Sequence, residues 1–222
     1  MKKLFFLALF SGLAGGAQAQ TAIKAGTIQL GGNVGYFRNS QDAPSFTNIN
    51  GSYNPITLTT TTSQFAISPA AGYFVADNLA IGISGTYQIT RYVNSATPAF
   101  LSSDRKVKQF KVGAFAQYYK MVSEQFGFTG TLGGGYQYNG RPFGYDSGDL
   151  AGKGFYANLT PAVVFFPIPK LAIGASIGGL DYSHYNVKAP DSSSPSDYKS
   201  SSFGANFGLS QLLFSGTFYF GR

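Results

Sequence analysis

The sequence predicts an all-β fold, an eight-stranded antiparallel up-and-down transmembrane β-barrel preceded by a cleaved signal peptide. The segment LAIGISGTYQI places Leu79, Ile81 and Ile83 on one face of a strand and small uncharged residues such as Ser84 on the other. Charged residues make up 11% of the chain, against roughly 25% in an ordinary soluble domain. Beyond the first residues no apolar run approaches the ~18 residues of a spanning helix. A closed barrel is then the remaining structure in which every backbone N–H and C=O group finds a hydrogen-bond partner inside a lipid bilayer.

The first nineteen residues have the three parts of a secretory signal peptide. Lys2 and Lys3 give a basic start, residues 4–13 form an apolar run, and Ala17 and Ala19 flank Gln18 in a small-x-small cleavage pattern. A retained membrane helix is disfavoured because the run is shorter than the ~20 residues that a span needs. We expect a signal peptide at 1–19, a barrel domain at 20–222, and export to the outer membrane of a Gram-negative bacterium.

The charge and cysteine content exclude several classes of function. Sixteen Lys and Arg against nine Asp and Glu give +7, and loss of Lys2 and Lys3 with the signal leaves +5. An exported chain meets no nucleic acid in routine work, so we expect no nucleic-acid partner. The sequence contains no cysteine, which excludes disulfides and thiolate metal sites. Its acidic residues are scattered, and we expect no metal and no cofactor.

Runs with a period of two residues, each bounded by turn residues, mark the strands in order. An even number of strands puts both chain ends on the periplasmic side. The eight predicted strands are 27–37, 64–74, 79–91, 105–120, 125–138, 154–166, 171–184 and 202–220.

The connectors between these runs alternate in length. Short ones lie at 75–78, 121–124 and 167–170, and the four long polar ones are 38–63, 92–104, 139–153 and 185–201. Short periplasmic turns and long outer loops are typical of bacterial barrels. A soluble β-sandwich, the alternative fold, has no reason to place every long loop at one end.

Two irregularities are predicted within the strands. Pro69 and Pro161 cannot donate to a strand ladder and are expected to mark bulges. In the last strand most apolar residues occupy odd-numbered positions before Ser210 and even-numbered positions after Gln211. One extra residue between the two parts would place them on a single lipid-facing side.

The aromatic last strand LLFSGTFYFGR and the hairpin GYFVADNLAIG (72–82) carry a family resemblance. With the eight strands and the signal, the chain resembles the small outer-membrane barrels of the OmpA/OmpX type and, more narrowly, the outer-membrane β-barrel-domain proteins of Bacteroidetes. The resemblance implies insertion by the barrel-assembly machinery, which reads the last strand. The chain departs from the family in that Gly221 and Arg222 follow Phe220.

The predicted lumen is lined by small, nearly uncharged residues, and Lys111 is its one predicted cation. An eight-stranded barrel is just wide enough for its side chains to fill it. We therefore expect a closed or nearly closed lumen and a structural or interaction role. Inward glycines remove volume, which leaves a narrow porin-like channel for small solutes as the alternative.

Catalysis is not expected. Some outer-membrane barrels resemble lipid A deacylases and palmitoyltransferases that use a His with a Ser. The single histidine, His184, is preceded by Ser183, but adjacent strand residues point to opposite faces. No local signature of either enzyme surrounds His184.

The outer rim is the predicted functional surface. Basic residues at the outer strand ends are placed to contact lipopolysaccharide phosphates, so outer-membrane lipid and lipopolysaccharide are the expected partners, together with an extracellular ligand bound by the loops. The predicted rim residues are Arg38, Arg91, Arg105, Lys106, Lys108, Arg141 and Lys153.

Overall fold

The computed structural model describes residues 22–49, 52–97, 102–143, 147–188 and 198–222, so the predicted signal peptide lies outside the described residues. The chain is built almost entirely of strands. They are β1 (Ile28–Ile49), β2 (Ser52–Ala76), β3 (Leu79–Thr97), β4 (Ser102–Met121), β5 (Phe126–Phe143), β6 (Ser147–Ile168), β7 (Leu171–Ser176), β8 (Gly178–Lys188), β9 (Tyr198–Phe207) and β10 (Leu213–Phe220), with the short 3-10 helix η1 (Leu209–Gln211) between the last two.

The strands form one closed antiparallel barrel. Each of the first six pairs with its neighbour in sequence, and β1 pairs with β10 to close the ring. β7 and β8 both pair with β6 and are two parts of one barrel strand interrupted at Ile177. β9 and β10 are likewise two parts of the last strand. The predicted count of eight barrel strands is confirmed.

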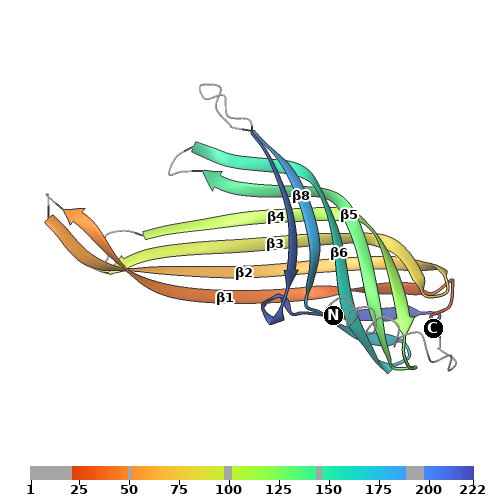
Figure 1. Cartoon of the computed structure of the whole chain (residues 1–222). Helices are drawn as coiled ribbons and strands as arrows, with labels where there is room; N and C mark the ends of the chain where they lie inside the picture. The colour runs from red at the N-terminus through yellow and green to blue at the C-terminus, as the bar shows by residue number, and fades with distance from the viewer. Residues whose placement is uncertain (1–21, 50–51, 98–101, 144–146, 189–197) are drawn as a thin grey trace, which may run out of the picture.

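The three short connectors lie at one end of the barrel, and the described chain begins and ends there too (Figure 1). In the turn between β2 and β3, Asn78 has a φ of 64°, a left-handed conformation that asparagine tolerates better than most residues. The segment before β1 is fixed to this turn. The Ile23 amide donates to Asn78 Oδ1 and the Ala25 amide to Asp77 Oδ1, each at 2.9 Å.

The predicted long outer loops are wrong as loops, because most of their residues belong to paired strands. β1 and β2 stay in register up to the pair Ile49 and Ser52, and β3 and β4 up to Ser95 and Ser102. The threonine-rich stretch 56–62, expected to be an exposed loop, is a continuous part of β2. Threonine is β-branched and favours strands, and pairing satisfies the backbone groups of both segments.

One of the two predicted proline bulges is confirmed. On one side Pro161 pairs in register with Gly130, but on the other side the two residues Thr160 and Pro161 lie opposite the three residues 177–179, so the register shifts by one. Pro69 pairs in register with Gly32, and the register of β2 on β3 is the same before and after it, so no bulge lies there. In the last strand the insertion is larger than the one residue expected. Phe207 pairs with Gly178 and Leu213 with Ser176, so the five residues 208–212, including η1, lie opposite the single residue Ile177.

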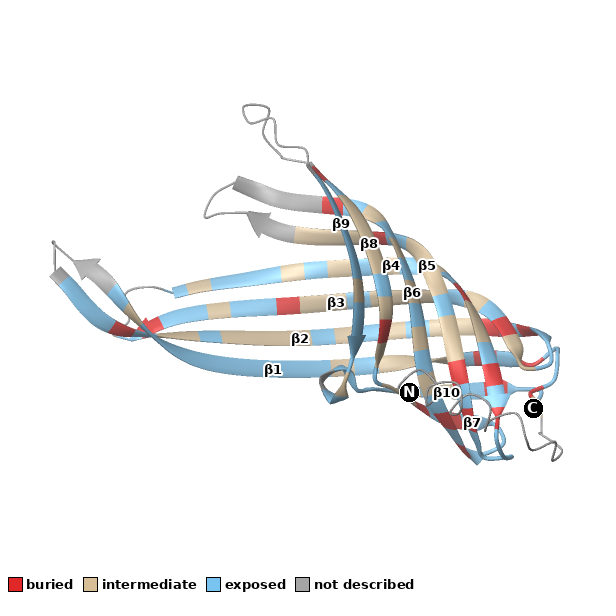
Figure 2. Ribbon diagram, viewed as in Figure 1, coloured by how far each residue is buried: buried red, intermediate tan, exposed pale blue. Residues whose placement is uncertain are grey.

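The outer surface of the barrel carries the apolar residues that the alternation predicts. Ile83 is 68% exposed and Ile81 49%, whereas Ala80 on the opposite face is fully buried. Exposed Phe, Tyr, Leu and Ile side chains continue around the other strands, and buried residues gather at the end that holds the chain termini (Figure 2). An apolar surface of this extent is typical of a protein that faces lipid. Within the described residues, no helix is both long enough and apolar enough to cross a membrane.

At its other end the barrel divides into two leaves. β1 pairs with β10 only from Ile28 to Gly32, and no pairing joins the rest of β1 to β9 among the described residues. Pairing of β4 with β5 ends at Lys108 and Gly140. Figure 1 shows β1–β4 running in one direction and β5, β6 and β8 in another. We call this gap the seam. It has β1 beyond Gly32 on one side, and β9 and the first residues of β10 on the other.

Candidate functional site

At the end of the barrel that holds the short turns, buried side chains form a cluster that we call the basal plug. Its members come from six strands, β2, β3, β4, β6, β7 and β10, and from the segment before β1, and each is at most 5% exposed. They are Ile23, Phe74, Ala80, Tyr119, Met121, Val164, Phe166, Ala172 and Tyr219. The rings of Phe74 and Phe166 contact that of Tyr219 with centroids 6.2 and 5.2 Å apart. Aromatic side chains from β2, β6 and β10 therefore meet in the interior of the barrel at this level.

Hydrogen bonds join the plug to the polar lumen above it. The Tyr119 hydroxyl donates to Gln29 Oε1 at 2.8 Å and lies 2.9 Å from the Tyr219 hydroxyl. Gln29 Nε2 in turn donates to Gln117 Oε1 at 2.9 Å. These groups belong to β1, β4 and β10, so the network ties together strands that are not neighbours in sequence. A buried network with satisfied partners adds rigidity to the packing.

Arg222 covers the outside of the plug. Its guanidinium carbon lies 3.7 Å from the centroid of the Phe166 ring, and Nη2 donates to the Glu124 carbonyl at 3.4 Å. The departure from the family pattern at the last two residues therefore has a structural use, because the arginine stacks on a plug residue.

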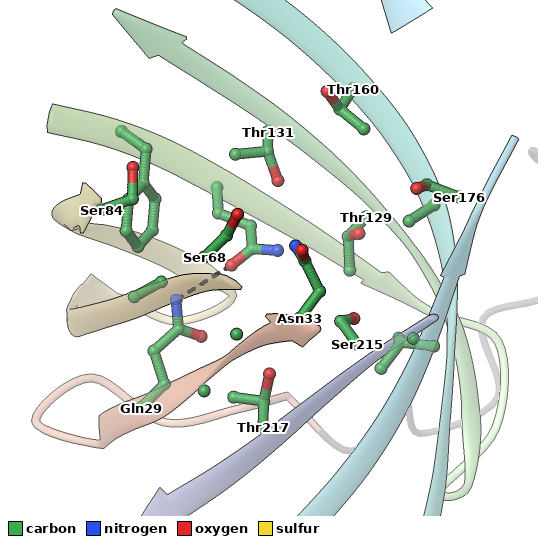
Figure 3. A pocket seen from close by; sticks show the side chains of 18 of the residues that line it. Gln29, Asn33, Ser68, Ser84, Thr129, Thr131, Thr160, Ser176, Ser215 and Thr217 are labelled. Carbon is green, nitrogen blue, oxygen red and sulfur yellow. Dashed lines mark hydrogen bonds between the residues drawn. The ribbon is translucent and has the colours of Figure 1, made fainter. Parts of the chain in front are cut away.

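Directly above the plug is a cavity of about 380 Å³, which we call the lumenal cavity. Hydroxyl and carboxamide side chains line it, and no charged residue of the described chain does. Figure 3 shows side chains including Ser68, Thr131 and Ser215 around this space. The prediction of a nearly uncharged lumen is confirmed, but the lumen is not filled at this level.

A second layer of side chains lies above the lumenal cavity. Tyr185 on β8 donates to Gln137 Oε1 at 2.9 Å and accepts from Gln109 Nε2 at 3.1 Å. Lys111, the predicted lumen cation, lies in this layer with its Nζ 5.2 Å from the centroid of the Tyr156 ring. The aromatic ring provides the cation with a local partner.

An outer cavity of about 530 Å³ follows towards the two leaves and is lined by β2, β3, β4 and β5. Gln88 lines it, and Thr86, the preceding inward residue of β3, lines the lumenal cavity. The two cavities are therefore adjacent along the same wall. Arg105 lines the outer cavity, so this predicted rim residue faces inward rather than towards the surrounding lipid.

Three of the predicted rim residues lie at one level on adjacent strands. Arg38 pairs with Ser63, Ser63 with Arg91, and Arg91 with Lys106, which places basic residues on β1, β3 and β4 in one row. We call Arg38, Arg91, Lys106 and the exposed Lys108 the basic row. Arg91 already binds Asp104 through two nitrogens, with Nε–Oδ1 at 2.9 Å and Nη2–Oδ2 at 2.6 Å.

The remaining two rim residues stand apart from this row. Lys153 is exposed on β6 opposite Tyr138. The side chain of Arg141 lies outside the described part of the structure, although its backbone in β5 pairs with that of Leu150 in β6. Which of the basic residues lie together follows from the strand register, which the sequence did not show.

His184 lies on the outer surface, where its ring contacts that of Phe155 with centroids 5.1 Å apart. Its Nδ1 is 2.8 Å from Ser201 Oγ, whereas Ser183 bonds to Ser202 at 2.8 Å. Ser183 and His184 have separate partners, as expected for adjacent residues of one strand. No cluster of three or more potential metal ligands occurs among the described residues.

Sequence reasoning missed the residues of the plug as a group. The predicted strands 64–74, 105–120, 154–166 and 202–220 contain Phe74, Tyr119, Phe166 and Tyr219, but the sequence analysis did not single them out as a cluster. Their shared feature is an inward-facing position close to the short turns. That feature can be read from parity once the turns are placed, and it is the signal that could have found them.

The sequence matches no protein-family model and no curated protein. Three solved structures have a similar overall arrangement. They are the outer membrane protein OprG of Pseudomonas aeruginosa (14% identity, 90% of this chain and 98% of that one, TM-score 0.44), the Escherichia coli outer membrane protein W (15%, 89% and 100%, 0.43) and the Yersinia pestis attachment invasion locus protein Ail, solved with the heparin analogue sucrose octasulfate (15%, 88% and 99%, 0.36). For the present chain the barrel is defined by its own strand pairing and its apolar outer surface.

Proposed function

We propose that this protein is an integral barrel of the Gram-negative outer membrane with a structural and interaction role, and that it does not conduct solutes across the membrane. The barrel-assembly machinery inserts it, and it has no catalytic role. Its working surfaces are the outer parts of the strands and the lumen above the plug. The apolar exterior supports the membrane location.

The observation that carries the closed-lumen proposal is the basal plug. Tyr119 and Tyr219 are 2% and 1% exposed, and they bond to each other across the lumen. Phe74 and Phe166 are at most 1% exposed and pack against them. A water-filled path would need these aromatic side chains to leave a well-packed site, which costs several kcal/mol.

The basic row supports a role in binding anionic lipid headgroups. Arg38, Lys106 and Lys108 are exposed on the outer parts of β1 and β4, and we place lipopolysaccharide phosphates at this level. Lys and Arg form strong charge-assisted hydrogen bonds with phosphate. We propose lipopolysaccharide and outer-membrane lipid as partners, and an extracellular ligand of the long outer strands as a further one.

Planar-bilayer recording tests the closed lumen. We expect no single-channel steps from the refolded wild-type protein at high load, and steps from the double variant Tyr119→Ala, Tyr219→Ala, because it loses the centre of the plug. Tyr118→Ala is the matched control, since Tyr118 is the adjacent residue and is 57% exposed on the outer face. Heat-modifiable migration on a detergent gel shows that each variant is folded.

Reproducible steps from the wild-type protein would contradict the closed lumen and favour the narrow porin-like channel. Steps from Tyr118→Ala as large as those from the double variant would mean that the plug is not what closes the lumen.

A further inference from the structure

The lumenal cavity is larger than an eight-stranded barrel normally leaves, and inward glycines are the reason. A Cβ on Gly82 would lie 2.6 Å from the Phe115 ring, and one on Gly133 would lie 2.5 Å from Asn158 Oδ1. Each glycine therefore makes room for a side chain of the neighbouring strand to lie flat against the wall. The side chains stay at the wall, and the middle of the lumen stays open.

The lining of this cavity has one chemical character. Among the described residues, eleven of its side chains carry a hydroxyl group, four are carboxamides, and none is charged. Some of these groups are used within the protein, since Ser68 bonds to Thr86 and Asn158 to Thr160. Among the described residues, the hydroxyl groups of Ser84, Thr131 and Ser176 line the cavity and make no side-chain hydrogen bond within the protein. Hydroxyl groups both donate and accept, so they suit a ligand that does the same.

Phe115 supplies the aromatic face of the lining outside the tyrosines of the plug. It is 8% exposed and lines the cavity, and its ring lies directly over the positions of Gly72 and Gly82 on β2 and β3. A volume of about 380 Å³ is within the range of small-molecule sites, roughly 300–1,000 Å³.

We propose that the lumenal cavity binds an uncharged, polyhydroxylated ring of the size of a monosaccharide, with its hydroxyl groups on the Ser, Thr and amide side chains and a C–H face against Phe115. A charged ligand is disfavoured because the lining holds no opposite charge. A purely apolar ligand would bury many hydroxyl groups without partners. The inference rests on the closed lumen of the proposed function, since the plug forms the floor of the site.

The lumenal cavity has two borders, and they correspond to two sources of the same chemistry. The outer cavity is adjacent to it along β3, where Thr86 lines one cavity and Gln88 the other, and this side suits a free sugar arriving from outside. The seam borders it as well, because Asn33 on β1 and Leu213 on β10 both line the cavity. That side suits the sugar headgroup of a glycolipid whose chain remains in the bilayer.

NMR titration of the full barrel in phosphatidylcholine nanodiscs tests the proposal. The probes are D-glucose and, dissolved in the nanodisc, dodecyl glucoside. We expect saturable shifts at cavity residues with at least one of them, and about tenfold weaker binding to Ser84→Ala, Thr131→Val, which removes two unpartnered hydroxyls. Ser95→Ala, Thr97→Val is the matched control on the exposed outer part of β3 and should bind as the wild type does.

The two probes separate the sources. Binding of glucose indicates a free sugar. Binding of dodecyl glucoside but not of glucose indicates a glycolipid headgroup, provided that the substitution Leu213→Trp at the seam abolishes this binding.

Three results would overturn the proposal. They are no saturable shift with either probe, equal binding by the double variant and the wild type, and equal shifts with glucose 6-phosphate. The bilayer recordings are independent of this test, so a barrel that neither conducts nor binds sugar would overturn the ligand and leave the closed lumen in place.

Discussion

At the scale of single residues, the alternation from Leu79 to Ile89 decides what each side chain meets. Ile83 points outward and is 68% exposed, and Ser84 next to it lines the lumenal cavity. Neighbours one position apart thus lie in lipid and in a polar cavity. Substitutions at the two positions should therefore have very different costs.

We predict that Ile83→Arg destabilises the barrel by ~2–4 kcal/mol, the cost of a cation near the bilayer midplane. Ser84→Thr should have a small effect, because a hydroxyl still faces the cavity. Reversible urea unfolding in lipid vesicles, followed by intrinsic tyrosine fluorescence or by gel shift, measures both. Small and equal effects at the two positions would contradict a lipid-facing outer surface.

At the scale of elements, the β2–β3 turn fixes the segment that precedes β1. The Ala25 amide donates to Asp77 Oδ1 at 2.9 Å, and Lys24 Nζ lies 3.6 Å from Asp77 Oδ2. The Ala25 hydrogen bond, assisted by the charge of Lys24, lowers the pKa of the exposed Asp77 carboxyl below its ordinary value of 3.8. This attachment holds Ile23 in the basal plug through the adjacent turn residue Asn78.

The lowered pKa of Asp77 gives a pH dependence of known sign. Because the folded-state pKa is below the unfolded one, the attachment is fully present above the unfolded pKa and is lost as the pH falls through the folded pKa. We expect amide exchange at 23–26 to quicken only below about pH 4. In Asp77→Asn the exchange should show no such step. A step centred above the ordinary aspartate pKa would contradict the interaction.

The lengths of the strands show where the local sequence pattern no longer predicted the structure. The strand cores were placed correctly because alternation was strong there, but the polar extensions of β1 and β2 were read as loops. Threonine and asparagine are polar like most loop residues, so the sequence alone does not mark them as strand residues. They form a strand here because a neighbouring strand pairs with them. The enlarged insertion at 208–212 follows from the separate registers of β9 on β8 and of β10 on β7. That difference appears only once the partners are known.

At the scale of the whole molecule, the barrel holds the basal plug at one end and divides into two leaves at the other. The basic row lies on the leaf formed by β1–β4. Strand tilt and register bring Arg38 and Lys106 to one level although 68 positions separate them in the sequence. The row is consequently a property of the assembled leaf.

We predict that the variant Arg38→Gln, Lys106→Gln, Lys108→Gln binds lipopolysaccharide severalfold more weakly than the wild type, because three charge-assisted contacts are lost. The difference should shrink as salt is added. Binding of labelled lipopolysaccharide to nanodisc-embedded protein measures both effects. Lys120→Gln, Lys170→Gln, at the end with the short turns, is the control and should bind normally; equal losses in the two variants would contradict a specific role for the row.

The sequence by itself determined the barrel, its eight strands, the end that holds the short turns, and which face of each strand is apolar. These features depend on local periodicity and composition, which a single chain displays directly. The tertiary structure alone decided that the base is plugged, that the lumen above it is open, and that the outer part splits at the seam. Tyr119 and Tyr219 meet across 100 residues of sequence. Contacts of this kind depend on strand register and barrel closure, which no local pattern records.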